Sequence, residues 1–163
     1  MIAQILARTP AWVFALFLGL LAFGLMQTRT RTVPRVPALL LPAGMIALSL
    51  AGIQTSFGLA PLPLASWAIA LALAALVGHA LFRDERVRYD ANAKTYFVPG
   101  SWVPLAVIMA IFFAKYVYAV MNALNAAVLS ATSFVIGLSA VYGLLSGYFA
   151  AKALNLVRLT RAA

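Results

Sequence analysis

The sequence lacks the residues on which most catalytic and metal sites depend. It contains no cysteine and one histidine, His79, among 163 residues. Without cysteine the protein forms no disulfide and offers no thiolate ligand. A single histidine leaves haem or a transition metal without the second strong ligand that such sites normally use. We therefore predict no metal site, no cofactor and no catalytic residue.

Acidic residues are also scarce, and their positions are restrictive. The three of them, Asp84, Glu85 and Asp90, lie within residues 83–101, so no long apolar run contains an acid. Proton-coupled transporters usually depend on Asp, Glu or His inside their spans, and the sequence disfavours that class. It also shows no Ser-His-Asp arrangement, phosphate-binding loop or zinc signature. An enzyme is the least favoured class, although a lipid or substrate could complete a membrane site.

Apolar residues are abundant instead. They make up 65% of the chain, and only 9% of residues are charged. A soluble fold must cover its core with polar side chains, which this composition does not supply. At about 20 residues per spanning helix, the chain has room for about five or six helices and no extramembrane domain. We predict an all-α fold, a polytopic bundle that forms a single transmembrane domain over residues 1–163.

Five apolar runs predict the membrane spans, at residues 10–27, 37–58, 61–82, 102–124 and 129–151. Proline marks the beginning of several runs, where the backbone donor that it lacks would have no partner anyway. Pro42 is the exception, because it lies about a turn into the second run. It predicts either a kink or a later start of that helix.

Basic residues predict the orientation of these spans. Residues 28–36 hold three of them, residues 83–101 hold four and the C-terminal end holds three, whereas the connections 58–60 and 125–128 hold none. Cytoplasmic connections collect Lys and Arg, so we predict an external N-terminus and a cytoplasmic C-terminus. The expected partners are the lipid bilayer and its anionic phospholipids, and no nucleic acid.

The connection at residues 83–101 is the longest polar segment. Its runs VRYD and TYFVPG flank a turn-like Ala91-Asn92-Ala93, which predicts a short cytoplasmic β-hairpin between the third and fourth helices. Two strands alone are marginally stable in water. We therefore expect three aromatic side chains of this connection to rest on the membrane interface: Tyr89, Tyr96 and Phe97.

Small residues predict how the helices associate, since lipid provides no hydrophobic force between them. In the fifth run, small residues recur at every fourth position: Ser139, Gly143, Gly147 and Ala151. Similar strips of alanine occur at residues 43, 47 and 51 and at residues 106, 110 and 114. We interpret the fifth-run strip as packing within one bundle. The alternative is a homo-oligomer in which the same strip forms the seam between copies.

Lys115 is the only basic residue inside an apolar run. It follows Trp102 by 13 residues, which places its Cα about 20 Å along the helix. At helical spacing it shares one face with Tyr118 and Asn122, and Tyr142 of the fifth run is a polar group that could face it. We name these four, Lys115, Tyr118, Asn122 and Tyr142, as candidate ligand-binding residues.

Two interpretations of Lys115 stay open. A charged lysine is costly in hydrocarbon unless water, carbonyl groups or an anion accompanies it. In the first interpretation its amine binds carbonyl groups at helix ends or Tyr and Asn side chains, and only fixes the rotation of its helix. In the second it meets the anionic group of a phospholipid or of a small amphipathic ligand.

Several segments suggest a family relationship. These are Arg88-Tyr89-Asp90, the residues 98–105 and 111–116, and the opening residues 4–6 and 9–10. With these segments the chain resembles a family of small, uncharacterised bacterial proteins. The resemblance implies a five-span, multi-pass protein of the bacterial inner (cytoplasmic) membrane in which Lys115 belongs to the family pattern. It implies no activity.

The sequence therefore favours a non-enzymatic membrane protein. The leading hypothesis is binding of an amphipathic or anionic ligand or lipid, or service as an accessory membrane subunit. The alternative is a small oligomeric transporter or channel subunit. A monomer with a cavity beside Lys115 would favour the first, and an assembly that encloses a polar path would favour the second.

Overall fold

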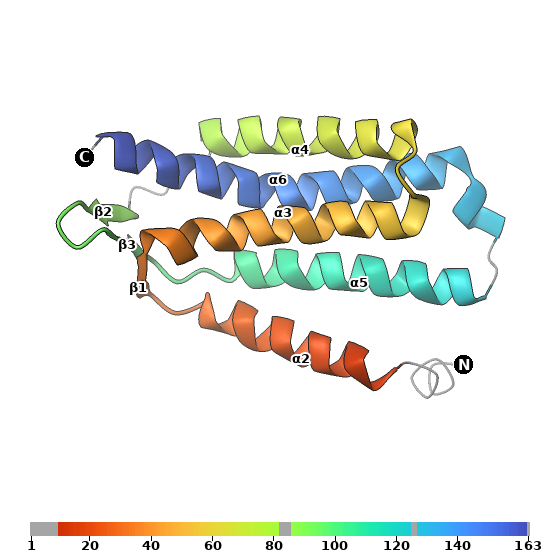
Figure 1. The fold of residues 1–163 in the computed structure, drawn as a ribbon, viewed down its shortest axis with the longest axis horizontal. Coiled ribbons are helices and arrows are strands. Elements are labelled where there is room, and N and C mark those ends of the chain that lie inside the picture. Colours follow the sequence, from red (N-terminus) through yellow and green to blue (C-terminus); the bar gives the residue numbers. More distant parts are fainter. Residues whose placement is uncertain (1–9, 82–85, 125–126, 163) are drawn as a thin grey trace. The chain divides into compact units, whose positions relative to one another are not determined.

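The computed structural model describes residues 10–81, 86–124 and 127–162 (Figure 1). The protein is mostly helical, as predicted. The described helices are α2 (Ala11–Met26), α3 (Arg35–Phe57), α4 (Pro61–Leu81), α5 (Val103–Ala123) and α6 (Thr132–Ala162), with a short 3-10 helix η1 (Ala127–Ser130). Three short strands accompany them, β1 (Arg31–Pro34), β2 (Arg88–Asp90) and β3 (Thr95–Val98).

Four of the described helices, α3 to α6, are long and apolar enough to cross a membrane. The first predicted span corresponds to α2, which has 16 residues. At 1.5 Å per residue this helix is about 24 Å long, shorter than a typical hydrocarbon core of about 30 Å. The structure thus supports four of the five predicted spans, and α2 is a shorter apolar helix.

The beginning of α3 differs from the prediction. The helix begins at Arg35, directly after β1, and continues through Pro42 to Phe57. Pro42 is fully buried. Because proline has no N–H, it leaves the carbonyl group of Ala38 without its helical donor. The alternative in which the helix begins only after Pro42 is therefore wrong.

The end of α6 also differs from the prediction. The helix has 31 residues and ends at Ala162, whereas the sequence suggested an end near Ala151. At 1.5 Å per residue it is about 46 Å long, well beyond a hydrocarbon core of about 30 Å. Hydropathy detects the apolar part of a helix and stops at Lys152, but the backbone continues as a helix whose Leu156 is 3% exposed.

The chain forms two compact units, of which the first contains α2 and α5. These two helices are antiparallel, because Phe17 contacts Phe112 at a ring-centroid distance of 5.3 Å while Gly24 lies against Leu105. The turn after α2 is tied to the approach to α5, since the Ser101 N–H donates to the Gln27 carbonyl group at 3.0 Å. Aromatic packing and one close glycine contact thus hold this unit.

The second unit contains α3, α4, α6, η1 and the strands. Within it, α6 lies between α3 and α4 (Figure 1). The small residues of α6 face α4: a Cβ at Gly143 would lie 2.8 Å from the Cβ of Ala70, and a Cβ at Gly147 would lie 2.8 Å from the carbonyl oxygen of Leu71. One turn further, Ala151 lies against Gly78. Because residue numbers rise in the same direction along both helices at this contact, α4 and α6 are parallel.

The predicted strip therefore packs against α4 of the same chain. Its fourth member, Ser139, is fully buried. The alanine strip of α3 behaves differently, because Ala43, Ala47 and Ala51 are exposed within this unit. Whether copies of the chain also associate through the α6 strip stays a prediction.

A buried hydrogen-bonded junction joins the three helices of the second unit. The indole N–H of Trp67 on α4 donates to the Oγ of Ser49 on α3 at 3.0 Å. The Ser49 hydroxyl in turn donates to the carbonyl group of Tyr142 on α6 at 3.3 Å. Ser49 and Tyr142 are both 0% exposed. In a membrane, where helices gain nothing from hydrophobic association, such a junction fixes their rotation and depth.

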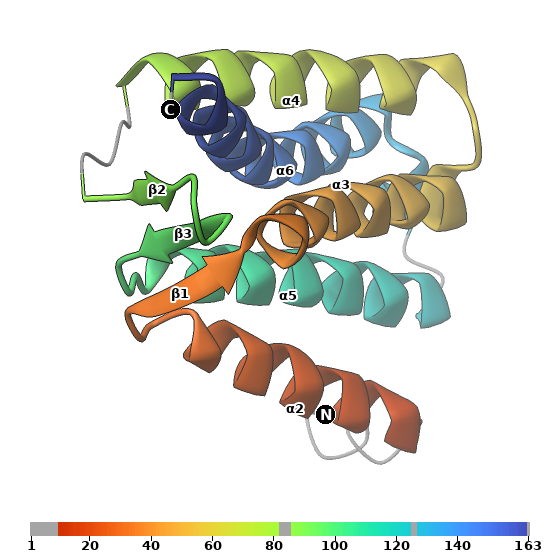
Figure 2. The same ribbon diagram turned by 60° about the vertical axis from the view of Figure 1, so that its left-hand side comes forward.

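The strands form one antiparallel sheet in the order β1-β3-β2, at the end of the second unit where α3 begins and α6 ends (Figure 2). Residues 83–101 thus contain the paired strands β2 and β3. Strand β1 comes from the first polar connection, and we had predicted no strand there. In the register, Val33 and Tyr89 both lie opposite Tyr96, on either side of it.

The inner face of this sheet packs on α6. Tyr96 is 0% exposed, its hydroxyl donates to the Leu156 carbonyl group at 3.0 Å, and it lies 3.1 Å from the Oγ1 of Thr160. The ring of Tyr89 stands 4.9 Å from that of Tyr96. Our expectation that Tyr96 rests on the membrane interface is therefore wrong, because Tyr96 is buried against α6. For Phe97 it stays a prediction. Consecutive residues of a strand point to opposite faces, so Phe97 lies on the outer face.

Candidate functional site

Lys115 lies past the middle of α5, an uncharged apolar helix apart from this residue. It is partly exposed. Counting back along the helix, Ile111 and Ile108 share its face and are 1% and 0% exposed. Counting forward, Tyr118 and Asn122 share it, and Asn122 is exposed. The face therefore changes from buried and apolar to exposed and polar, with the amine at the transition.

The contact between α2 and α5 lies to one side of Lys115 on the surface of α5. It uses Leu105 and Phe112, and Lys115 is displaced from Phe112 by about 60° around the helix axis, given about 100° per residue. Beside it, the rings of Phe112 and Tyr116 are stacked, with an interplanar angle of 10°. The described contacts of α5 with α2 are thus centred beside Lys115 and not on it.

The structure brings three of the four predicted site residues onto one helix face. Tyr142, the fourth, belongs to the second unit, where its side chain is fully buried and its carbonyl group accepts from Ser49. In the same core, Ser139 and Ser146 are 0% exposed, and their hydroxyl groups have no hydrogen-bond partner among the described residues. Within residues 10–81, 86–124 and 127–162, no group of three or more His, Cys, Asp or Glu could hold a metal ion.

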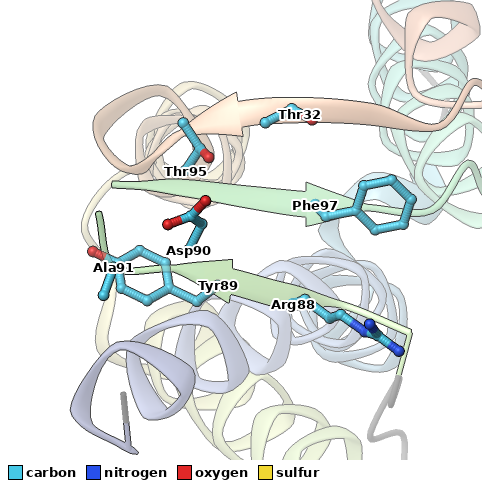
Figure 3. Close-up of a pocket in the computed structure, with 7 residues that line it drawn as sticks. All are labelled: Thr32, Arg88, Tyr89, Asp90, Ala91, Thr95 and Phe97. Atoms are coloured by element: carbon cyan, nitrogen blue, oxygen red, sulfur yellow. The ribbon is translucent and has the colours of Figure 1, made fainter. Parts of the chain in front are cut away.

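Sequence reasoning missed a second site, a depression of about 460 Å³ on the outer face of the sheet (Figure 3). Arg88 on β2 and Thr32 on β1 both lie opposite Phe97 on β3. Figure 3 shows Arg88 and Phe97 toward one end of the strands, and Asp90 and Thr95 toward the other. The alternation of side chains along residues 88–90 and 95–97 could have predicted most of the residues on this face. The position of Thr32 could not be predicted without β1.

Asp90, the only acidic residue that the structure describes, is already engaged in the hairpin turn. Its Oδ1 accepts the backbone N–H groups of Asn92 at 2.9 Å and of Ala93 at 3.1 Å. Among the residues that line the outer face, Arg88 is the base and Asp90 the acid. Other exposed basic side chains belong to segments next to the sheet in this unit: Arg35, Arg86, Lys94, Arg158 and Arg161. The outer face therefore offers one arginine beside an acid that the hairpin turn already holds.

A comparison with protein families gives one result for the whole chain. The model of one family matches residues 1–163. The chain belongs to DUF6622, a family of unknown function. Comparison of this DUF6622 member with curated proteins and with solved structures finds no match. Membership in DUF6622 therefore brings no activity with it.

Proposed function

We propose that this DUF6622 member is an integral membrane protein that binds the anionic group of an amphipathic ligand or lipid beside Lys115. One observation carries the proposal: a lysine lies deep within α5, and no apolar run of the chain contains an acid. A cation in hydrocarbon needs a counter-charge or polar contacts. A phosphate or carboxylate from outside the chain supplies the counter-charge.

The neighbours of Lys115 suit such a ligand. The phenol of Tyr118 and the amide of Asn122 can each donate to an anionic oxygen. Val117, one of the exposed apolar residues of α5, offers apolar surface on the helix, whereas Ile108 and Ile111 are buried. The arrangement holds no nucleophile beside a base, so binding rather than catalysis is the activity that it supports.

The decisive comparison is between Lys115→Met and Lys115→Arg. Methionine keeps the length and apolar character of the side chain and removes its charge, whereas arginine keeps the charge. We expect native mass spectrometry of the detergent-solubilised protein to show at least about tenfold weaker binding of oleate to Lys115→Met, equivalent to about 1.4 kcal/mol, and near-normal binding to Lys115→Arg.

Val117→Met is the matched control, because Val117 lies on α5 and is 52% exposed. It should bind oleate as the unmodified protein does. Binding by Lys115→Met equal to that of Val117→Met would contradict the proposal. The same spectra report assembly mass, and a dimer or larger assembly would favour the alternative of an oligomeric transporter or channel subunit. That alternative needs the α6 strip, whose Gly143 and Gly147 already contact α4.

We further propose that the chain crosses a bacterial inner membrane five times, with its N-terminus outside and the sheet on the cytoplasmic side. One observation supports this orientation. Basic residues lie in the segments next to the sheet, as they do in cytoplasmic segments. The parallel directions of α4 and α6 fit a third and a fifth span in either orientation.

Labelling tests the orientation directly, since the chain has no cysteine of its own. In Ala60→Cys the thiol follows α3 at the end away from the sheet, whereas in Asn92→Cys it lies in the hairpin turn. In intact cells we expect an impermeant maleimide to label Ala60→Cys and to label Asn92→Cys only after permeabilisation. The opposite pattern would reverse the orientation.

A further inference from the structure

We propose that the outer face of the three-stranded sheet docks the headgroup of an anionic phospholipid, with the phosphate at Arg88 and the glycerol region against Phe97. This inference goes beyond the ligand site at Lys115 and does not depend on it. It concerns different residues, in the other compact unit, at the membrane surface rather than within the membrane.

The two faces of the sheet differ in what covers them. Tyr96 closes the inner face against α6 and is 0% exposed. On the outer face Phe97, the next residue, is 46% exposed, and Arg88 opposite it is exposed. The face thus presents an exposed apolar ring next to an arginine, and basic side chains at a membrane surface attract anionic headgroups.

The groups on the outer face match the parts of a phospholipid headgroup. The guanidinium of Arg88 can donate two parallel hydrogen bonds to a phosphate. Thr32 and Thr95 carry hydroxyl groups that line the same depression, which measures about 460 Å³ (Figure 3). Because Asp90 already accepts two backbone N–H groups, its carboxylate is held at the hairpin turn.

Chain connectivity places this face at headgroup depth. Strand β1 ends at Pro34 and α3, an apolar helix of spanning length, begins at the next residue. The N–H of Arg35 donates to the Lys94 carbonyl group at 3.1 Å, which ties the hairpin to the first turn of α3. The sheet therefore cannot move away from the membrane end of that helix while these contacts hold.

Charge selects the occupant. Arg35, at the start of α3, and Lys94, in the hairpin turn, are exposed and add positive charge next to that of Arg88. Anionic lipid is attracted to clusters of this kind at a membrane surface, whereas a zwitterionic lipid has no net charge to contribute. The surface thus suits phosphatidylglycerol or another lipid with a net negative headgroup, and not phosphatidylcholine.

The test uses the full chain in mild detergent, titrated with dioleoylphosphatidylglycerol or dioleoylphosphatidylcholine and followed by native mass spectrometry. We expect Arg88→Gln to weaken phosphatidylglycerol binding at least about tenfold and Phe97→Ala to weaken it about threefold or more, values that correspond to loss of one charge-assisted contact and of one apolar contact. Phosphatidylcholine binding should not change. Arg161→Gln is the matched control, because it removes the same charge from an exposed position on α6.

Three results would overturn the proposal. Equal weakening by Arg88→Gln and Arg161→Gln would mean diffuse attraction without a site. Displacement of phosphatidylglycerol by an equimolar amount of inorganic phosphate would mean a site for a soluble anion. Loss of phosphatidylglycerol binding in Lys115→Met but not in Arg88→Gln would place the lipid at Lys115, and the proposed function would then stand without this surface. Conversely, failure of oleate binding at Lys115 leaves the Arg88 result unaffected.

Discussion

Leucine at Gly143 and Gly147 together is expected to prevent α4 and α6 from packing. At both positions a Cβ would meet backbone atoms. These are the carbonyl group of Trp67 at Gly143 and the carbonyl oxygen of Leu71, 2.8 Å away, at Gly147. Backbone atoms cannot rotate aside as the end of a side chain can. Overpacking of a well-packed core costs about 1–3 kcal/mol per site, and a typical folded domain has only about 5–15 kcal/mol in total.

Thermal unfolding followed by circular dichroism in detergent measures the effect. The double variant should melt far below the unmodified protein or elute as aggregate in size-exclusion chromatography. Gly137→Leu is the control, because Gly137 lies on the same helix and a Cβ there would have no neighbour within 4 Å. Similar melting of Gly137→Leu and Gly147→Leu would show that the α4 contact does not limit stability.

Tyr96→Ala is expected to release the sheet from α6. The substitution empties the volume of a ring that is 0% exposed and removes the donor to the Leu156 carbonyl group. Replacing a buried aromatic residue with alanine costs about 3–5 kcal/mol. Since β1, β2 and β3 are short and Tyr96 lies in the central strand, this loss exceeds what the remaining ladder contacts can offset.

Limited proteolysis of the polar connection reports this release, because an undocked hairpin is cleaved faster. Tyr96→Phe, which loses only the hydroxyl group, should cost about 1–2 kcal/mol and show an intermediate rate. Phe97→Ala is the control on the neighbouring residue, whose side chain is 46% exposed. A connection in Tyr96→Ala as resistant as in Phe97→Ala would contradict the docking role of Tyr96.

Features set by neighbouring residues could be predicted from the sequence. Apolar runs located α3, α4 and α5 to within a few residues, since the length of an apolar run is a local property. The shared face of Lys115, Tyr118 and Asn122 follows from helical spacing alone. The small-residue strip of α6 likewise indicated close helix contact, although the identity of its partner, α4, required the structure.

Features set by residues far apart in the chain could not be predicted from the sequence. Strand β1 was missed because residues 31–34 become a strand only through pairing with β3, and no local sequence pattern predicts that pairing. The extension of α6 was missed for a related reason, since its last turns are held by Tyr96 rather than by lipid. Tyr142 was named for its polarity, yet its environment is decided by Ser49, which is 93 residues away.

The strand order has a consequence for how the protein is made. β1 has one neighbour in the sheet, β3, which follows it after both α3 and α4. At a synthesis rate of about 5–20 residues per second, the roughly 60 intervening residues take about 3 to 12 seconds. During that time β1 has left the ribosome but its partner β3 has not been synthesised. Proline and charged residues disfavour edge pairing, so Pro34 and the flanking arginines protect β1 from pairing with other strands. The sheet can therefore close only after both α3 and α4 have been synthesised, so its completion is a late event that depends on where these two helices place the ends of the chain.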